Sequence, residues 1–357
     1  MKPVALYGPF KHLGDCAWSA ELPAPPPEPS RTGTAPALFL YENNKRFGQR
    51  NSGEPAIREQ GRGRYIYGQR ELIFSTPDNT DPNTNGRAYS AVWLDKEFLR
   101  DRFRYFQSYI TSLFDHCALG LGELSGKTIL EIGASGHWGA SFLLCGLGAR
   151  VAALEPRGEG WRADFHPAFI DVICEQGEAH YPQFNSEGLR RCVEENRLVP
   201  EHILCLDETV ETLPTDWDGA FDITASVSTL EHVHNVPLAL ARLAAVTKAG
   251  GVGAHHIDFC DHRDARRPLE FLLLSNDEFE AAAGSYKYEI GNRCRPAELQ
   301  ELCLRAGFPS VREVAKGLIS EAYLDEVLPR LRGSQSRFSQ EGRESVQKAY
   351  GVYLMKK

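Results

Sequence analysis

Acidic and histidine side chains gather in two short segments that could move a proton or hold a metal ion. In the first, Glu231 and His232 are adjacent. The second, about 25 residues later, contains His255, His256, Asp258, Asp261 and His262. Because an imidazole titrates near neutral pH, a histidine placed beside a hydroxyl group can take its proton.

Both segments follow apolar runs that predict β-strands. Residues 220–233 read AFDITASVSTLEHV, and residues 248–259 read KAGGVGAHHIDF. In an open α/β sheet, loops that leave the carboxyl ends of the strands converge on one ligand crevice. The two segments are therefore predicted to meet in space.

Three interpretations of these residues remain open. In the first, His256 or His262 is a general base, and His255 is a further catalytic candidate. In the second, Glu231, His232 and His256 bind a divalent metal ion that lowers the pKa of a substrate hydroxyl. In the third, the Leu-Glu-His string is structural, with Glu231 bonded to backbone and His232 half-buried.

A glycine-containing turn is the strongest sign of a ligand. In residues 128–139, TILEIGASGHWG, a β-branched and apolar run ends in an acid and breaks into glycines. Gly133 and Gly136 permit a tight turn and a close approach of backbone to a nucleotide-like ligand. A second strand-like run ends in Glu155, where an acid can accept hydrogen bonds from a ribose diol. Ser135 stands where the nicotinamide-cofactor fingerprint requires a glycine.

This arrangement resembles motif I, and the acid that pairs with it, in class I S-adenosylmethionine-dependent methyltransferases. Residues 220–233 resemble the fourth strand and following loop of that family, and 248–259 its Lys-Pro-Gly-Gly turn and fifth strand, with Ala249 replacing the proline. ELCLRAGF at 301–308 and the sequence YGVYLMKK resemble the last helix and the closing antiparallel strand.

The resemblance implies an α/β, Rossmann-like fold: a seven-stranded, mostly parallel sheet with helices on both faces. It also implies an S-adenosylmethionine site, with Asp207 and Thr209 as alternatives for the adenine amine. The cofactor residues expected are Glu131, Gly133, Ala134, Ser135, Gly136, Glu155, Pro156, Asp207, Thr209 and Ser226. Metal-using members of the superfamily have Glu-x-x-Glu-His and a later histidine, but Ser228 replaces the first glutamate here.

The function implied is methyl transfer to a polar small molecule, at a hydroxyl of a sugar, glycan or glycosylated metabolite. The string HHIDF-x-DH and a β-rich extension resemble methyltransferases that act on such acceptors. The alternatives are a nicotinamide-dependent sugar oxidoreductase and a non-catalytic protein that binds a cofactor or serves as a scaffold.

Further acceptor contacts are expected from three regions. Asp258 lies in the histidine segment, and Asn292, Arg293 and Arg295 in GNRCRP could hold a phosphate or carboxylate or be solvated surface groups. Arg87 and Tyr89 follow a loop rich in Asn, Asp and Gly that is predicted to close over the ligands.

The chain divides into three predicted parts. Residues 1–35 are predicted to be a proline-rich extended tether, and residues 36–94 a β-rich module and possible lid. Residues 95–357 form the methyltransferase domain, with helical insertions near 157–200 and 317–347. The module or the insertions could support an oligomer.

Composition limits the partners. With 40 Lys and Arg against 48 Asp and Glu, the net charge is −8, which disfavours nucleic acid as a partner. Nine cysteines lack C-x-x-C spacing, which indicates reduced thiols and a cytoplasmic protein. No apolar run approaches the roughly 18 residues of a membrane span.

Overall fold

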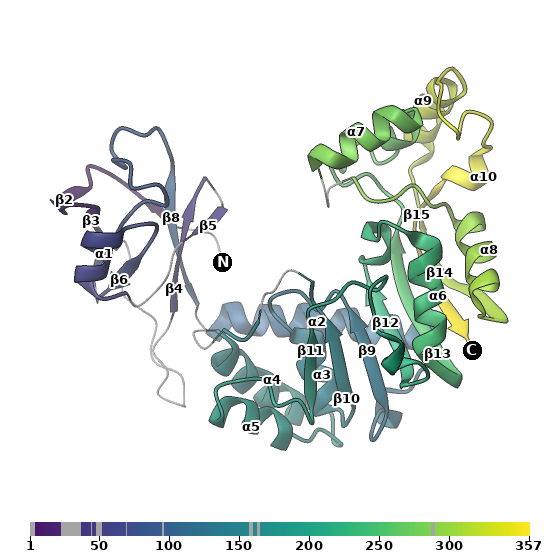
Figure 1. The fold of residues 1–357 in the computed structure, drawn as a ribbon, viewed down its shortest axis with the longest axis horizontal. Helices are drawn as coiled ribbons and strands as arrows, with labels where there is room; N and C mark the ends of the chain where they lie inside the picture. The colour runs from purple at the N-terminus through teal and green to yellow at the C-terminus, as the bar shows by residue number, and fades with distance from the viewer. Residues whose placement is uncertain are drawn as a thin grey trace. The chain divides into compact units, whose positions relative to one another are not determined.

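The computed structural model describes residues 4–22, 37–43, 45–47, 52–68, 70–94, 96–156, 160–162, 165–286 and 290–357. Two compact units divide the chain: Met1–Arg102 with Arg162–Val172, and Phe103–Trp161 with Ile173–Lys357. Figure 1 shows the elements of both.

The N-terminal unit is β-rich, as predicted. Its two antiparallel sheets have the strand orders β1-β8-β4-β5 and β2-β3-β7-β6. The elements are β1 Val4–Leu6, β2 Lys11–Gly14, β3 Ala17–Glu21, β4 Ala37–Glu42, β5 Lys45–Phe47, α1 Glu54–Gln60, β6 Tyr65–Tyr67, β7 Glu71–Phe74 and β8 Tyr89–Leu94. The first three strands lie in the segment expected to be an extended tether. They form part of the module because β1 pairs with β8 and β3 pairs with β7. The proline run at 23–30 is outside the described residues.

The second unit contains one seven-stranded sheet with the order β11-β10-β9-β12-β13-β15-β14. Its strands are β9 Thr128–Ile132, β10 Arg150–Leu154, β11 Ile203–Leu206, β12 Phe221–Val227, β13 Thr247–Asp258, β14 Ser310–Leu318 and β15 Lys348–Lys356. The strands from β11 to β13 are mutually parallel, and β15 is antiparallel to both neighbours. This sheet confirms the predicted Rossmann-like methyltransferase fold.

Helices and short 3-10 turns connect these strands. The helices are α2 Lys96–His116, α3 Gly139–Gly146, α4 His166–His180, α5 Glu187–Glu194, α6 Val236–Val246, α7 Asn276–Tyr286, α8 Pro296–Ala306, α9 Glu321–Arg332 and α10 Arg343–Val346. The 3-10 turns are η1 Leu121–Glu123, η2 Thr215–Trp217, η3 Leu230–His232 and η4 Glu270–Leu273.

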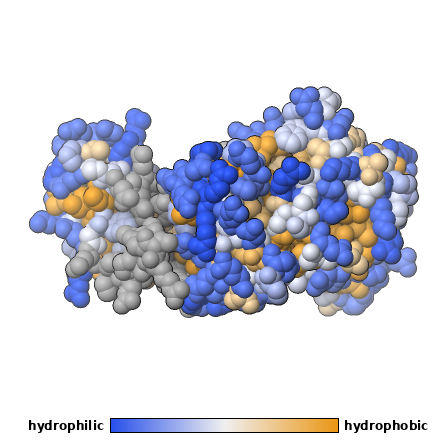
Figure 2. Space-filling model, turned by 90° about the horizontal axis from the view of Figure 1, so that it is seen from below, coloured by the Kyte–Doolittle hydropathy of each residue, from blue (hydrophilic) through white to orange (hydrophobic). Residues whose placement is uncertain are grey.

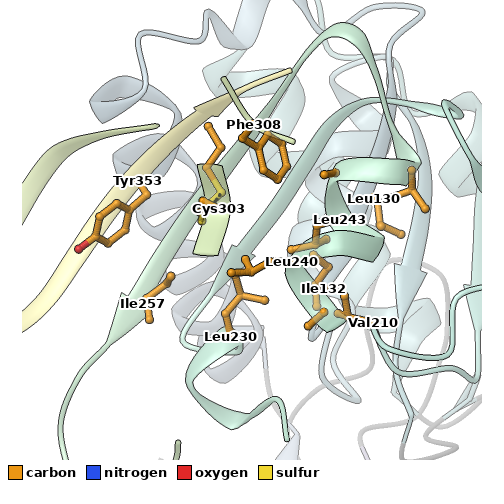
Figure 3. Close-up of a cluster of buried hydrophobic side chains, with 14 of the residues drawn as sticks. Leu130, Ile132, Val210, Leu230, Leu240, Leu243, Ile257, Cys303, Phe308 and Tyr353 are labelled. Atoms are coloured by element: carbon orange, nitrogen blue, oxygen red, sulfur yellow. Dashed lines mark hydrogen bonds between the residues drawn. The ribbon is translucent and has the colours of Figure 1, made fainter. Parts of the chain in front are cut away.

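One hydrophobic core cluster of this unit lies between the sheet and helices α6 and α8. Leu130 and Ile132 are two residues apart on β9, so their side chains lie on the same face of the sheet. They share one buried cluster with Leu240 and Leu243 of α6 (Figure 3). Cys303 of α8 belongs to the same cluster. Burial of these side chains fixes the register of the strands, and with it the positions of the loops at their carboxyl ends.

A second cluster in this unit belongs to its C-terminal helices. Leu324, Leu328 and Leu331 of α9 pack with Leu269 and Phe271, which lie beyond β13. This cluster supports the segment that follows the histidine string.

On the face seen in Figure 2, hydrophilic residues are interspersed with hydrophobic ones. Among the helices that the structure describes, none combines the length and apolar character needed to cross a membrane.

Candidate functional site

The turn after β9 is pressed against the loop after β12. Gly133 has φ +81°, and a Cβ atom there would lie 2.3 Å from Thr229 Oγ1. The Thr229 hydroxyl donates to the carbonyl oxygen of Ile132 at 3.1 Å. Only glycine meets both the steric and the conformational requirement at this position. The turn after β9 and the loop after β12 are therefore in direct contact.

Glu131, at the end of β9, is buried and accepts a hydrogen bond from the Ser141 hydroxyl of α3. Burial raises the pKa of Glu131 to about 7, and the charge of Glu155 acts in the same direction. The contact shows that Glu131 joins the strand to the helix that follows the glycine turn. Its contact with a cofactor stays a prediction.

The other predicted cofactor residues lie mostly at the same edge of the sheet, since they follow parallel strands. Glu155 comes directly after β10, is 4% exposed, and its backbone amide bonds to the Leu206 carbonyl. Asp207 and Thr209 follow β11 and are both exposed, and the choice between them for the adenine amine stays a prediction. Of the remaining turn residues, Ala134 and Gly136 are buried, and Ser135 and Pro156 are exposed.

Ser226 and His255 form a buried pair inside the sheet. The Ser226 hydroxyl lies 2.8 Å from Nδ1 of His255, and the Thr224 hydroxyl lies 3.4 Å from Nε2. Burial lowers the pKa of His255 to about 3, so the ring is neutral. Both ring nitrogens are occupied and the residue is fully buried. We therefore assign His255 a structural role instead of the expected catalytic one, and Ser226 the role of its partner instead of a cofactor ligand.

His256 points to the opposite face of β13, because adjacent residues of a strand alternate. There it lines a cavity of about 380 Å³, the aromatic trough, with seven other residues. The trough is lined by Tyr105, Ser108, Tyr109, Ser112, Leu113, Val227, His256 and Val352. None of these side chains is a carboxylate, an amine or a guanidinium. The volume suits a small-molecule ligand.

The His256 ring is half-buried and stacks on Tyr350, with ring centroids 4.9 Å apart. Its Nδ1 lies 3.4 Å from the Ser228 hydroxyl. Burial lowers the pKa of His256, against the opposing effect of the Asp258 carboxylate. The imidazole is therefore neutral at physiological pH and able to accept a proton.

A second group forms beside the trough from Glu231, His232 and His262. The potential ligand atoms of these three residues lie within 4.8 Å of one another, and the two imidazole centroids are 5.0 Å apart. His256 is not a member of the group, so His262 replaces it in the metal set predicted from the sequence. The alternation of β13 explains the difference, because it directs His256 into the trough.

Glu231 is 3% exposed, and both of its carboxylate oxygens lack a hydrogen-bond partner. The backbone amides of Glu231 and Asp258 lie near the carboxylate without hydrogen-bond geometry, so the expected bond to backbone is not formed. Burial raises the pKa of Glu231 to about 8, helped by the charge of Asp258. Asp258 Oδ2 in turn lies 3.4 Å from Nε2 of His262, and this contact raises the pKa of His262.

Asn292 holds the loop that carries Glu231. Its side-chain amide donates to the carbonyls of Leu230 and Val233 at 2.9 and 3.2 Å, and its backbone amide donates to the Glu231 carbonyl. Asn292 thus positions the loop, and its amide group is occupied by that task.

The two arginines of GNRCRP are neither anion ligands nor solvated surface groups. Arg293 is 6% exposed and donates to the Leu274 carbonyl and the Asn276 side chain, both at 2.7 Å. Arg295 is 3% exposed and donates to the carbonyls of Phe259, Val346 and Lys348. Backbone carbonyls therefore occupy the guanidinium groups that were expected to bind a phosphate or carboxylate.

Arg87 and Tyr89 belong to a polar network within the N-terminal unit. Arg87 forms ion pairs with Glu42 at 3.1 Å and Asp78 at 2.6 Å. The Tyr89 hydroxyl donates to Glu42 and accepts from Asn85. These bonds brace the loop; a role toward the acceptor stays a prediction.

Tyr105 and Tyr109, which line the trough, were not among the site residues predicted from the sequence. Tyr105 and Tyr109 are four residues apart on α2, as are Ser108 and Ser112, so both pairs face one side of the helix. Tyr105 is 53% exposed, in contrast to the buried stripe at Phe106 and Ile110. The sequence pattern that could have revealed the trough is this second stripe of tyrosines and serines, which lies beside the apolar stripe of the same helix.

Part of the second unit matches a known protein family. Residues 143–254 match a methyltransferase-domain family. A search of curated proteins finds no match. Similar solved structures include the YcgJ protein from Bacillus subtilis, with 14% identity over 69% of this chain and 96% of the other and a TM-score of 0.38. An S-adenosylmethionine-dependent methyltransferase from Mesorhizobium loti is 13% identical over 66% of this chain and 93% of the other, also with a TM-score of 0.38. The match runs from α3 into β13, and the strand order of the seven-stranded sheet is the one predicted for the Rossmann-like methyltransferase fold.

Proposed function

We propose that this methyltransferase transfers the methyl group of S-adenosylmethionine to a hydroxyl of a sugar, glycan or glycosylated metabolite. The observation that carries the proposal is the aromatic trough, which holds His256 at the same sheet edge as the glycine turn. The acceptor oxygen forms a bond to the methyl carbon while the carbon–sulfur bond breaks. The sulfur keeps the electron pair, and the hydroxyl proton passes to His256.

The donor end of the site is the turn at Gly133 together with Glu155. Parallel strands β9 and β10 bring these residues to one edge, and a carboxylate at Glu155 can accept hydrogen bonds from the ribose diol. Val227 of the trough follows Ser226, which pairs in register with Ile132, directly before Gly133. An acceptor in the trough thus lies next to the donor turn, as in-line transfer requires.

The lining of the trough supports a neutral acceptor that carries hydroxyls. Tyr105 and Tyr109 offer faces against which the C–H faces of a sugar ring can pack, and Ser108 and Ser112 offer hydroxyl partners. The absence of fixed charges from this lining would leave a phosphate or carboxylate uncompensated. These features favour a sugar hydroxyl over an anionic acceptor.

The test is calorimetry of the full-length protein with S-adenosylmethionine and with a nicotinamide dinucleotide, followed by mass spectrometry of extracts incubated with labelled donor. Binding of S-adenosylmethionine and label on a neutral glycoside oxygen are expected. The oxidoreductase alternative is disfavoured because β15 lies antiparallel between β13 and β14, unlike the all-parallel order of dinucleotide-binding folds. Label on nitrogen or carbon would contradict the proposed acceptor.

Replacement of Glu155 by alanine is expected to weaken S-adenosylmethionine binding by about 1.5 to 3 kcal/mol, because charged hydrogen bonds to the ribose are lost. This corresponds to about 10- to 150-fold in Kd, measured by calorimetry. Glu201→Ala is the matched control, since this exposed acid precedes β11 and so lies at the opposite edge. Equal affinities for Glu155→Ala and wild type would remove Glu155 from the site.

The pH dependence of kcat/KM is expected to report the neutral form of His256. Its pKa is lowered by burial, against the opposing charge of Asp258, and His116 lowers it further. At neutral pH, His256 is therefore almost entirely in its unprotonated, active form. Activity is lost only as the pH falls through the pKa of His256, which lies below the ordinary 6.5. An acidic limb of kcat/KM for the acceptor centred above 6.5, measured with the donor saturating, would argue against His256 as the base.

A further inference from the structure

Glu231 presents a buried carboxyl group that the polypeptide does not satisfy. At 3% exposure, neither carboxylate oxygen has a hydrogen-bond partner. An isolated carboxylate is far more costly to bury than a paired one. The loop cannot readily turn it outward, because Asn292 binds the carbonyls of Leu230, Glu231 and Val233. The fold thus holds the carboxylate in place at an energetic disadvantage.

The groups that face this carboxylate are two imidazoles. Potential ligand atoms of Glu231, His232 and His262 lie within 4.8 Å of one another, although His262 comes from a different loop. Asp258 lies 3.4 Å from Nε2 of His262, the kind of contact by which carboxylates orient histidine ligands of metals. Three donors, a carboxylate and two imidazoles, thus converge on one point.

We propose that Glu231, His232 and His262 bind one divalent transition-metal ion, with Asp258 orienting His262. A set of two histidines and one carboxylate suits Mn²⁺, Fe²⁺, Co²⁺, Ni²⁺ or Zn²⁺ better than Ca²⁺ or Mg²⁺, which favour all-oxygen sites. One carboxylate leaves a net positive charge on the site, and three protein ligands leave coordination positions open.

The consequence for catalysis rests on the proposed function, whereas metal binding itself does not. The Tyr109 hydroxyl donates to the carbonyl of Val227 at 3.1 Å, and both residues line the trough. Val227 ends β12 four residues before Glu231, so the ion site adjoins the acceptor cavity. An ion with open positions would take oxygen atoms of the acceptor and lower the pKa of the reacting hydroxyl. His256 stays outside the ligand set and remains able to accept the proton.

The first experiment measures binding of Mn²⁺ and of Co²⁺ to full-length protein after chelator treatment and dialysis, without donor or acceptor. Electron paramagnetic resonance follows Mn²⁺, and absorption spectroscopy distinguishes Co²⁺ at imidazoles from Co²⁺ at the nine cysteine thiols. One equivalent of metal is expected per chain. Glu231→Gln and His262→Asn should abolish it, and Asp258→Asn should weaken it about 10- to 100-fold.

Matched controls separate this site from its neighbours. His234→Ala removes an exposed histidine two residues from His232, and His256→Ala removes the histidine of the trough. Both should retain wild-type metal affinity. Loss of binding in His256→Ala with retention in His262→Asn would overturn the proposed ligand set.

A measurement of melting temperatures shows whether a variant loses metal binding because it folds poorly or because it lacks a ligand. In chelator, Glu231→Gln should have a melting temperature at least equal to that of wild type, because a neutral amide replaces a buried carboxyl group that has no hydrogen-bond partner. Added Mn²⁺ or Co²⁺ should raise the melting temperature of wild type only.

Failure of both metals to bind, or equal binding and stabilisation in Glu231→Gln, would overturn the site. S-adenosylmethionine calorimetry on the same metal-free protein separates the two proposals. Metal binding without donor binding would contradict the function alone, and donor binding without metal binding would contradict the ion site alone.

Discussion

Replacement of His256 by alanine is expected to lower kcat by about 10²- to 10⁴-fold, the usual contribution of a general base. The affinity for S-adenosylmethionine should stay unchanged, because His256 lines the trough and not the glycine turn. The ring stacks on Tyr350, so its loss also opens the trough, and a modest rise in the acceptor KM is expected as well. Steady-state kinetics on the identified acceptor, with calorimetry for the donor, measures all three quantities.

His234→Ala is the control for this experiment. His234 is an exposed histidine on the loop after β12, and its removal should leave kcat within twofold of wild type. A His256→Ala enzyme that keeps the wild-type rate would exclude His256 as the base. A kcat loss with an equal loss of donor affinity would instead indicate a structural defect at the sheet edge.

Replacement of Gly133 by alanine is expected to damage both stability and donor binding. The residue has φ +81°, which costs an L side chain about 1 to 2 kcal/mol. The new Cβ would also lie 2.3 Å from Thr229 Oγ1 and 2.8 Å from its Cγ2. Overpacking of this kind adds about 1 to 3 kcal/mol. The free energy of unfolding should therefore fall by about 2 to 5 kcal/mol, and the Kd for S-adenosylmethionine should rise at least about tenfold.

Gly122→Ala provides the comparison, because a Cβ at Gly122 meets no atom within 4 Å. It should leave melting temperature and donor affinity near wild type. Chemical denaturation and calorimetry of the two variants test the expectation. Wild-type stability and affinity in Gly133→Ala would mean that the β9 turn and the β12 loop are not held together as the structure describes.

The sheet and its ligand edge could be predicted because they depend on local pattern. Apolar runs that end in Glu131, Glu155 and the Leu-Glu-His string marked strand ends, and parallel strands bring such ends to one edge. The parallel order of the strands predicts that the loops of Gly133 and Thr229 lie at the same edge. It does not predict that they pack so closely that only glycine fits at position 133.

Side-chain direction within the edge could not be predicted in the same way. His255 and His256 are neighbours of the same type, yet one is sealed between Thr224 and Ser226 and the other lines the trough. Sequence gives the alternation of a strand but not which face holds the cavity. Only the packing of α2 against that face decides it.

Burial of charged groups was the other feature that pattern could not reveal. Arg293 and Arg295 are residues of the type that bind anions. In the structure, however, Arg293 donates to the carbonyl of Leu274 and Arg295 to the carbonyl of Val346, both distant in sequence. The strands before residue 22 were missed for a related reason: each is only three to five residues long. Such short runs gain their order from distant partners.

The position of β15 has a consequence for synthesis on the ribosome. This strand follows β14 in the sequence but lies between β13 and β14 in the sheet. When Asp258 has emerged, the outer edge of β13 still lacks its partner, which begins only at Lys348. An open strand edge invites pairing with other chains until it is covered. The nascent chain therefore passes through a stage that is vulnerable to aggregation and suited to chaperone binding. This stage ends when β15 inserts between β13 and β14.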